Sequence, residues 1–83
     1  MGKKPPHLKL REVEANLISL GFKFKNQVGS HKQYERPADG KRRRAVVTVD
    51  VGKGQFDHFL MKSMIRQSGF SAEEFCTGIV KSN

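Results

Sequence analysis

Apolar residues near the start of the chain recur first at the spacing of a helix and then at the spacing of a strand. From Leu8 to Leu20 they return every three or four positions, which predicts a helix with one buried face. From Phe22 to Val28 they alternate with polar residues, so a strand here would bury Phe22 and Phe24. The period changes at Gly21, a residue type that commonly ends helices.

Two further strands follow, over His31 to Arg36 and over Arg43 to Val51, where the period of two continues. Turn residues bound them, with Gly29-Ser30 before the first strand and Pro37-Ala38-Asp39-Gly40 between the two. Three consecutive strands with short connections predict an antiparallel meander, with His31 at the start of its middle strand.

Two helices are predicted after the strands. The first runs from Asp57 to Ser68 with apolar residues on one face, and Gly69 ends it. Ser71 and Glu74 have capping-box spacing and predict a short helix from Ala72 to Val80. The order αβββα with a short C-terminal helix predicts an α+β fold, in which helices cover one face of a three-stranded antiparallel sheet. This two-layer arrangement is that of double-stranded RNA-binding domains.

The length of 83 residues indicates one domain. Residues 1–7 contain Lys3-Lys4-Pro5-Pro6 and are predicted to be a flexible basic arm, followed by a single domain over residues 8–83. A chain this short buries only about 60% of its unfolded surface, so no deep cleft for a small-molecule cofactor is expected.

Several other classes of site are not expected. Cys76 is the only cysteine, so it forms no internal disulfide and no zinc site alone, and the three histidines lack metal-ligand spacing. The chain has no apolar run of about 18 residues that could cross a membrane. We therefore predict a cytoplasmic protein without a metal.

Positive charge is concentrated in one part of the chain. The net charge is +8 and the pI is about 10.1. The segment from Lys23 to Arg44 contains eight Lys or Arg residues and only two acidic residues. A phosphate backbone is the partner that such a surface favours, because neutralising the backbone releases counterions, although a solvated basic face is the alternative. The candidate RNA-binding residues are Lys25, Ser30, Lys32, Lys41, Arg42, Arg43 and Arg44.

The tripeptide Gly29-Ser30-His31 places one imidazole among these cations. Histidine has an unperturbed pKa of about 6.5 and exchanges protons near neutral pH, so His31 is a candidate general base. Lys25 and Lys32 are predicted to be its nearer charged neighbours, since a strand separates it from residues 41–44. Ser30 is interpreted as a turn residue rather than a nucleophile, because no acid–base relay is visible for it.

The order and spacing of several segments between Leu8 and Phe75 carry a family resemblance. They are Leu10-Arg11-Glu12-Val13, Leu20-Gly21-Phe22, Gly29-Ser30-His31, Tyr34, Asp39-Gly40, Val47-Thr48-Val49 and Ile65-Arg66-Gln67-Ser68-Gly69-Phe70-Ser71-Ala72-Glu73-Glu74-Phe75. Together they resemble the HicA toxins, also called YcfA-like mRNA interferases, the toxic half of HicA–HicB toxin–antitoxin pairs. Many members have a second histidine after the third strand, where this chain has Val51-Gly52-Lys53-Gly54.

The resemblance implies an endoribonuclease that cleaves mRNA without a metal, with His31 as its catalytic histidine and a HicB-like protein as its antitoxin. In such a reaction the 2′-hydroxyl attacks the phosphorus once a base removes its proton. The proton for the leaving 5′-oxygen would come from water or from protonated His31. The alternative is a non-catalytic RNA-binding module of the same fold.

Overall fold

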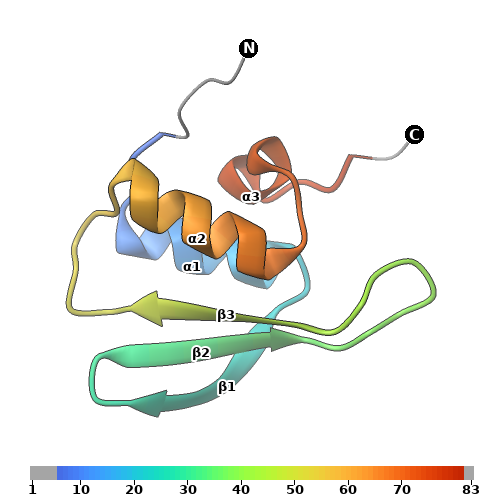
Figure 1. Cartoon of the computed structure of the whole chain (residues 1–83), viewed down its shortest axis with the longest axis horizontal. Coiled ribbons are helices and arrows are strands. Elements are labelled where there is room, and N and C mark those ends of the chain that lie inside the picture. The colour runs from blue at the N-terminus through green and yellow to red at the C-terminus, as the bar shows by residue number, and fades with distance from the viewer. Residues whose placement is uncertain (1–5, 82–83) are drawn as a thin grey trace.

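In the computed structural model, which describes residues 6–81, three helices and three strands follow one another in the predicted order (Figure 1). The elements are α1 (Leu10–Ser19), β1 (Lys23–Val28), β2 (His31–Arg36), β3 (Ala45–Asp50), α2 (His58–Ser68) and α3 (Ala72–Thr77). The strands form an antiparallel sheet in the order β1-β2-β3, so β2 is the middle strand. The predicted α+β fold of the double-stranded RNA-binding type is confirmed.

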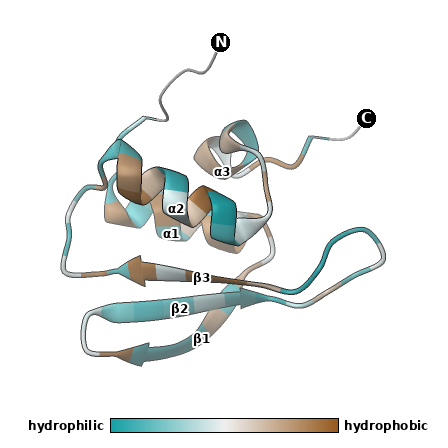
Figure 2. Ribbon diagram, viewed as in Figure 1, coloured by the Kyte–Doolittle hydropathy of each residue, from teal (hydrophilic) through white to brown (hydrophobic). Residues whose placement is uncertain are grey.

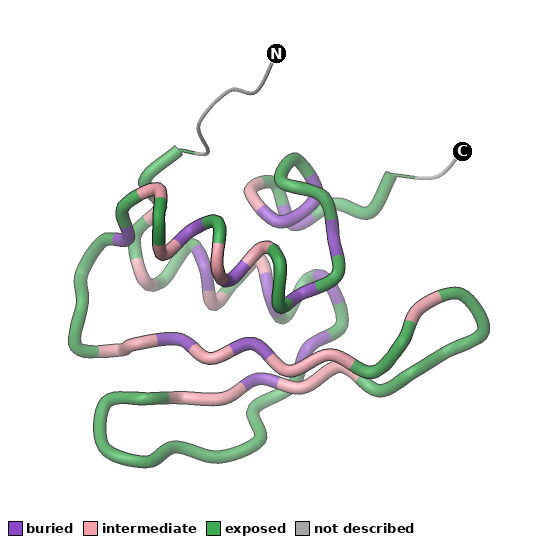
Figure 3. The backbone as a smooth tube through the Cα atoms, viewed as in Figure 1, coloured by how far each residue is buried: buried purple, intermediate pink, exposed green. Residues whose placement is uncertain are grey.

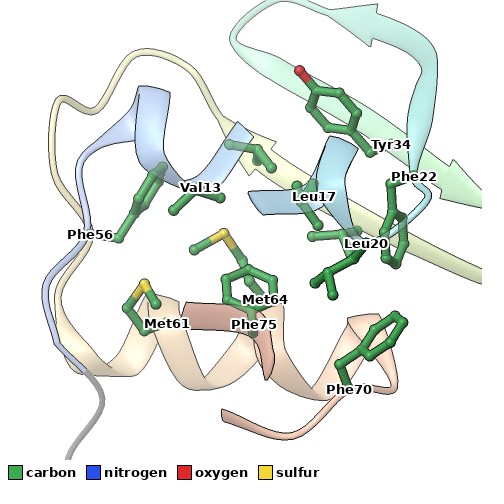
Figure 4. Packing of buried hydrophobic residues seen from close by; sticks show 12 residues of the cluster. Val13, Leu17, Leu20, Phe22, Tyr34, Phe56, Met61, Met64, Phe70 and Phe75 are labelled. Carbon is green, nitrogen blue, oxygen red and sulfur yellow. The ribbon is translucent and has the colours of Figure 1, made fainter. Parts of the chain in front are cut away.

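The helices gather on one side of the sheet, where α2 packs against β3 and α1 packs against α3 (Figure 1). The buried positions lie on these helices, on the helix-facing side of β2 and β3, and in the connections at Leu20, Phe22, Phe56 and Phe70 (Figure 3). Side chains from both layers converge in the core, as Figure 4 shows. Its members are Val13, Leu17, Leu20, Phe22, Tyr34, Val47, Val49, Phe56, Met61, Met64, Phe70 and Phe75.

The segment before α1 is tied to the loop before α2. The backbone N–H of Phe56 donates to the carbonyl of Leu8 at 3.0 Å, and Leu10 N–H donates to the carbonyl of Gly54 at 3.1 Å. These bonds hold Phe56 in the core, where its side chain is fully buried. Most of the predicted flexible arm, residues 1–5 of 1–7, lies outside the described residues.

The prediction that β1 buries Phe24 is wrong. Phe22, just before the strand, is 1% exposed, whereas Phe24 is 56% exposed. The pairing with β2 shifts between Phe24 and Asn26, so Lys25 is the extra residue of a β-bulge. Every residue of β1 is exposed, because β1 is an edge strand that the helix layer does not cover.

The last helix ends earlier than predicted, at Thr77 rather than Val80, because Gly78 takes a left-handed conformation with φ of 73°. Side-chain hydrogen bonds attach α3 to α1 at this point. The amide of Asn16 donates to the carbonyls of Phe75 and Cys76 at 3.0 Å each, and Ser19 Oγ donates to the carbonyl of Gly78 at 2.7 Å.

Two glycines with left-handed φ should respond differently to alanine. At Gly69 the space that an alanine methyl group would occupy is open, so Gly69→Ala should lower the free energy of unfolding by about 1–2 kcal/mol, the conformational penalty alone. At Gly78 a Cβ would lie 2.9 Å from Asn16 Oδ1 and 3.2 Å from Asn16 Cα. Gly78→Ala should therefore lower the free energy of unfolding by about 1–3 kcal/mol more than Gly69→Ala does, because the added methyl group overpacks the site. Urea unfolding measures both, and equal losses would contradict the α1–α3 contact.

Candidate functional site

His31 is exposed at the start of β2, immediately after the two-residue turn Gly29-Ser30. It pairs with Val28 of β1 on one side and with Asp50 of β3 on the other. Val51 N–H donates to the carbonyl of Ser30 at 2.8 Å, which places His31 and Asp50 in a non-hydrogen-bonded pair of the ladder. In such pairs the two side chains stand on the same face and are closest to each other. The imidazole of His31 therefore has a carboxylate as its cross-strand neighbour.

A pocket of about 210 Å³ opens beside His31, between β3 and α2. We call it the His31 pocket; its lining residues are His31, Thr48, Asp50, Phe56, Leu60, Ser63, Met64 and Gln67. Its apolar side chains come from α2 and the preceding loop, and its polar groups come from β2, β3 and α2. A planar group could lie against the apolar wall and make hydrogen bonds at the edge, as a nucleobase does in single-stranded RNA recognition.

The backbone fixes the carboxylate of Asp50. Its Oδ1 accepts a hydrogen bond from Gly52 N–H at 2.9 Å. A Cβ at residue 52 would lie 3.2 Å from that same oxygen, so glycine allows this close approach. With one oxygen held in this way, the carboxylate has a defined position beside His31.

Gln67 is held from the opposite wall of the pocket. Its side-chain Oε1 accepts a hydrogen bond at 3.0 Å from the backbone N–H of Thr48, which points outward from the edge of β3. The amide orientation is set by this bond, because only the oxygen can accept it. The Nε2 group of Gln67 is then the part of the amide that can donate to a ligand.

Lys32 lies on the other face of the sheet from His31, since adjacent strand residues alternate. Its Nζ is 2.9 Å from Glu14 Oε2 on α1, and Tyr34 OH donates to the same oxygen at 2.5 Å. The hydrogen bond to Glu14 raises the pKa of Lys32 to about 12. Lys32 is thus next to His31 along β2, but its ammonium group is paired with Glu14 on the opposite face of the sheet. Its contact with RNA stays a prediction.

The other predicted RNA-binding residues are separated. Ser30 is in the turn next to His31, and Lys25 is exposed at the β1 bulge. Residues 41–44 lie in the hairpin between β2 and β3, at the opposite end of the sheet from His31 (Figure 1). Figure 2 shows this hairpin as largely hydrophilic, in contrast to β3. The fold thus places the hairpin cations one strand length from the imidazole.

Two arginines of the hairpin are paired with acids. Arg44 forms an ion pair with Glu35 of β2. Arg42 lies 3.5 Å from a carboxylate oxygen of Glu74, and its guanidinium stacks over the ring of Phe70 with its carbon 3.8 Å from the centroid. The contacts of Arg42 hold the hairpin against the connection between α2 and α3.

Among residues 6–81, no three His, Cys, Asp or Glu side chains come together as a group that could hold a metal ion. Within the same range, none of the helices has the length and apolar character needed to cross a membrane.

Comparison with known proteins identifies one family. The family model described as HicA toxin of bacterial toxin–antitoxin matches residues 10–70, most of the chain. The match includes all residues of the His31 pocket and of the hairpin between β2 and β3. No curated protein matches the chain.

The contact of Glu14 with Lys32 and Tyr34 should make stability depend on pH. Burial raises the pKa of Glu14, but hydrogen bonds from Lys32 and Tyr34, with the charge of Lys32, outweigh it and lower the pKa below 4.5. A carboxyl group whose pKa is lower in the folded state stabilises the fold at pH values above its unfolded-state pKa. This stabilisation is lost as the pH falls through its folded-state pKa. Glu14→Gln should therefore reduce the free energy of unfolding by about 1 kcal/mol at neutral pH.

The difference between wild type and Glu14→Gln should shrink as the pH falls below the ordinary pKa of a glutamate, about 4.3, toward the lower pKa of Glu14 in the folded state. Chemical denaturation across this range measures it. Glu73→Gln is the matched control, because its ion pair with Lys81 is 61% exposed on both sides and should contribute little. A difference that is constant with pH would contradict the role of the Glu14 charge.

Proposed function

This chain belongs to the HicA toxin family of bacterial toxin–antitoxin systems, and from that premise we propose that it is an endoribonuclease that cleaves mRNA with His31 as general base. One observation carries the proposal: an exposed imidazole lies at the mouth of a nucleobase-sized pocket, with a backbone-held carboxylate as its cross-strand neighbour. The mRNA substrate agrees with the net charge of +8.

The proposed reaction uses the RNA's own 2′-hydroxyl as nucleophile. His31 removes the proton from this hydroxyl, the 2′-oxygen forms a bond to phosphorus, and the bond from phosphorus to the 5′-oxygen breaks. The leaving oxygen takes a proton from water or from the protonated His31. The products are a 2′,3′-cyclic phosphate and a 5′-hydroxyl, so the reaction needs neither an oxidant nor a metal as co-reactant.

Asp50 acts in this proposal as a positioning residue. A carboxylate beside a catalytic histidine holds the imidazole in one orientation and stabilises the imidazolium that forms when the ring accepts a proton. The cross-strand pairing and the bond from Gly52 favour this role for Asp50. The nucleoside next to the cleaved bond would place its base in the His31 pocket, near the Nε2 group of Gln67.

As the toxin of a toxin–antitoxin system, the chain pairs with an antitoxin. We expect a HicB-like protein that carries acidic groups, because the toxin has a net charge of +8. Covering the His31 pocket would block access of RNA to the imidazole. Both partners would act in the cytoplasm, where mRNA is found.

Replacing His31 with alanine should lower cleavage of mRNA by about 10²–10⁴-fold, because the general base is lost, and should leave RNA binding nearly unchanged. Cleavage of an end-labelled RNA and growth after induced expression measure the first effect, and fluorescence anisotropy measures the second. His58→Ala is the matched control, since His58 stacks on His7 and does not line the His31 pocket.

The chemical groups at the ends of the cleaved RNA, and the effect of a metal chelator on activity, distinguish this mechanism from others. A 5′-phosphate on the products, or loss of activity with EDTA, would contradict it. Wild-type protein that binds RNA and never cuts it would instead identify a non-catalytic RNA-binding module.

Asp50→Asn should lower kcat by about tenfold or more, well short of the roughly 10⁴-fold loss known for a buried triad aspartate, because this site is open. KM and the free energy of unfolding should change little, since asparagine has the same shape and can still accept the bond from Gly52. Steady-state kinetics and urea unfolding test these expectations together. An unchanged kcat would exclude Asp50 from the reaction.

A further inference from the structure

A second cavity, larger than the His31 pocket, lies where the hairpin between β2 and β3 meets the end of α2. It has a volume of about 340 Å³ and is lined by Arg36, the four cations of residues 41–44, Gln67 and Gly69, among others. We call it the basic groove. Gln67 lines both the basic groove and the His31 pocket, so the two are neighbours along the seam between β3 and α2.

The cations around the basic groove are not equally available. Arg36, Arg42 and Arg44 form ion pairs with Asp39, Glu74 and Glu35 respectively. Lys41 and Arg43 form no ion pair within residues 6–81, and both are exposed. Two free positive charges are therefore presented at the groove on a hairpin that the paired arginines hold in place.

Asp39 fixes the turn that carries these free cations. Its carboxylate accepts hydrogen bonds at 2.8 Å each from the backbone N–H groups of Lys41 and Arg42, and one at 2.7 Å from Arg36. The bond from Lys41 N–H, followed by those from Arg36 and Arg42, lowers the pKa of Asp39 to about 2. The turn is thus ordered before any ligand arrives, which reduces the entropy lost on binding.

Arg36 lines the basic groove and adds positive charge to it. Its Nε donates to the carbonyl of Leu20 at 3.1 Å and its Nη2 to Asp39, but its buried Nη1 has no hydrogen-bond partner in the described part of the chain. Because this nitrogen is buried, an anion in the groove would be attracted by the charge of Arg36 and would not contact its unpartnered N–H group.

We propose that the basic groove binds a backbone phosphate of the RNA, remote from the phosphate that is cleaved at His31. The free guanidinium of Arg43 has the planar donor geometry that suits a phosphate, and Lys41 adds a point charge. This inference rests on the proposed function for the identity of the cleaved phosphate, but the groove's contact with RNA does not depend on cleavage.

The distance between the two sites sets the length of RNA that can use both. Ala45 at the basic groove and Asp50 at the His31 pocket are the two ends of β3. Five residue steps of about 3.4 Å span roughly 17 Å. A strand whose base at the cleaved bond turns into the His31 pocket is not fully stacked, so the seam would accommodate a few nucleotides, with Gln67 between the two sites.

Cleavage of oligoribonucleotides of increasing length tests this geometry. For wild type, kcat/KM should rise with each added nucleotide until the substrate spans both sites, and then level off. Arg43→Ala should lose about tenfold in kcat/KM on longer substrates, mainly through KM, and nothing on the shortest ones. Arg11→Ala is the matched control, because Arg11 is an exposed arginine on α1 that lines neither cavity.

A binding experiment keeps the proposal testable if no cleavage is found. With His31→Ala protein and a labelled RNA of about eight nucleotides, adding Arg43→Ala should weaken binding and reduce the slope of log affinity against log salt by about 0.7. Equal affinities with and without Arg43 would overturn the groove proposal while leaving the role of His31 intact. Loss of antitoxin binding on Arg43→Ala, with RNA binding unchanged, would also overturn it and identify a protein-docking surface.

Discussion

The register of β2 on β3 is the constraint on which the rest of the surface depends. It sets His31 opposite Asp50 at one end of the sheet and Arg36 opposite Ala45 at the other. A slip by one residue would separate the imidazole from the carboxylate and would also turn core side chains toward solvent. The buried pair of Tyr34 and Val47 prevents such a slip, because both side chains belong to the core. The packing that stabilises the fold therefore also positions both candidate sites.

Local patterns in the sequence predicted the order of the elements and the place of His31, since each depends on residues close together in the chain. The partner of His31 could not be predicted in the same way. The loop of residues 37–44 is too long to fix how β2 and β3 align, unlike the two-residue turn between β1 and β2. No local pattern in the sequence therefore identifies Asp50 as that partner, although Gly52 two positions later allows the contact that holds its carboxylate.

The exposure of Phe24 and the ion pairs of the cations could not be predicted from local sequence patterns, because both depend on how separate segments pair in the fold. The bulge at Lys25 interrupts the alternation that predicted two buried rings. The contacts of Lys32 with Glu14 and of Arg42 with Glu74 join residues far apart in the sequence. The sequence gives the number of charged residues, and the fold determines which of them form ion pairs. The basic character of the chain thus follows from its sequence, whereas the identity of the unpaired cations follows only from the fold.

The hydrogen bond from Thr48 N–H to Gln67 also affects how the sheet meets other chains. An open sheet edge presents a row of unpaired donors and acceptors, on which a strand of another molecule can assemble. Here the side chain of Gln67 occupies one outward donor of β3, and on the other edge the bulge at Lys25 breaks the regular spacing of β1. Neither edge offers an uninterrupted template, so these two irregularities protect a small, exposed sheet against aggregation by strand addition.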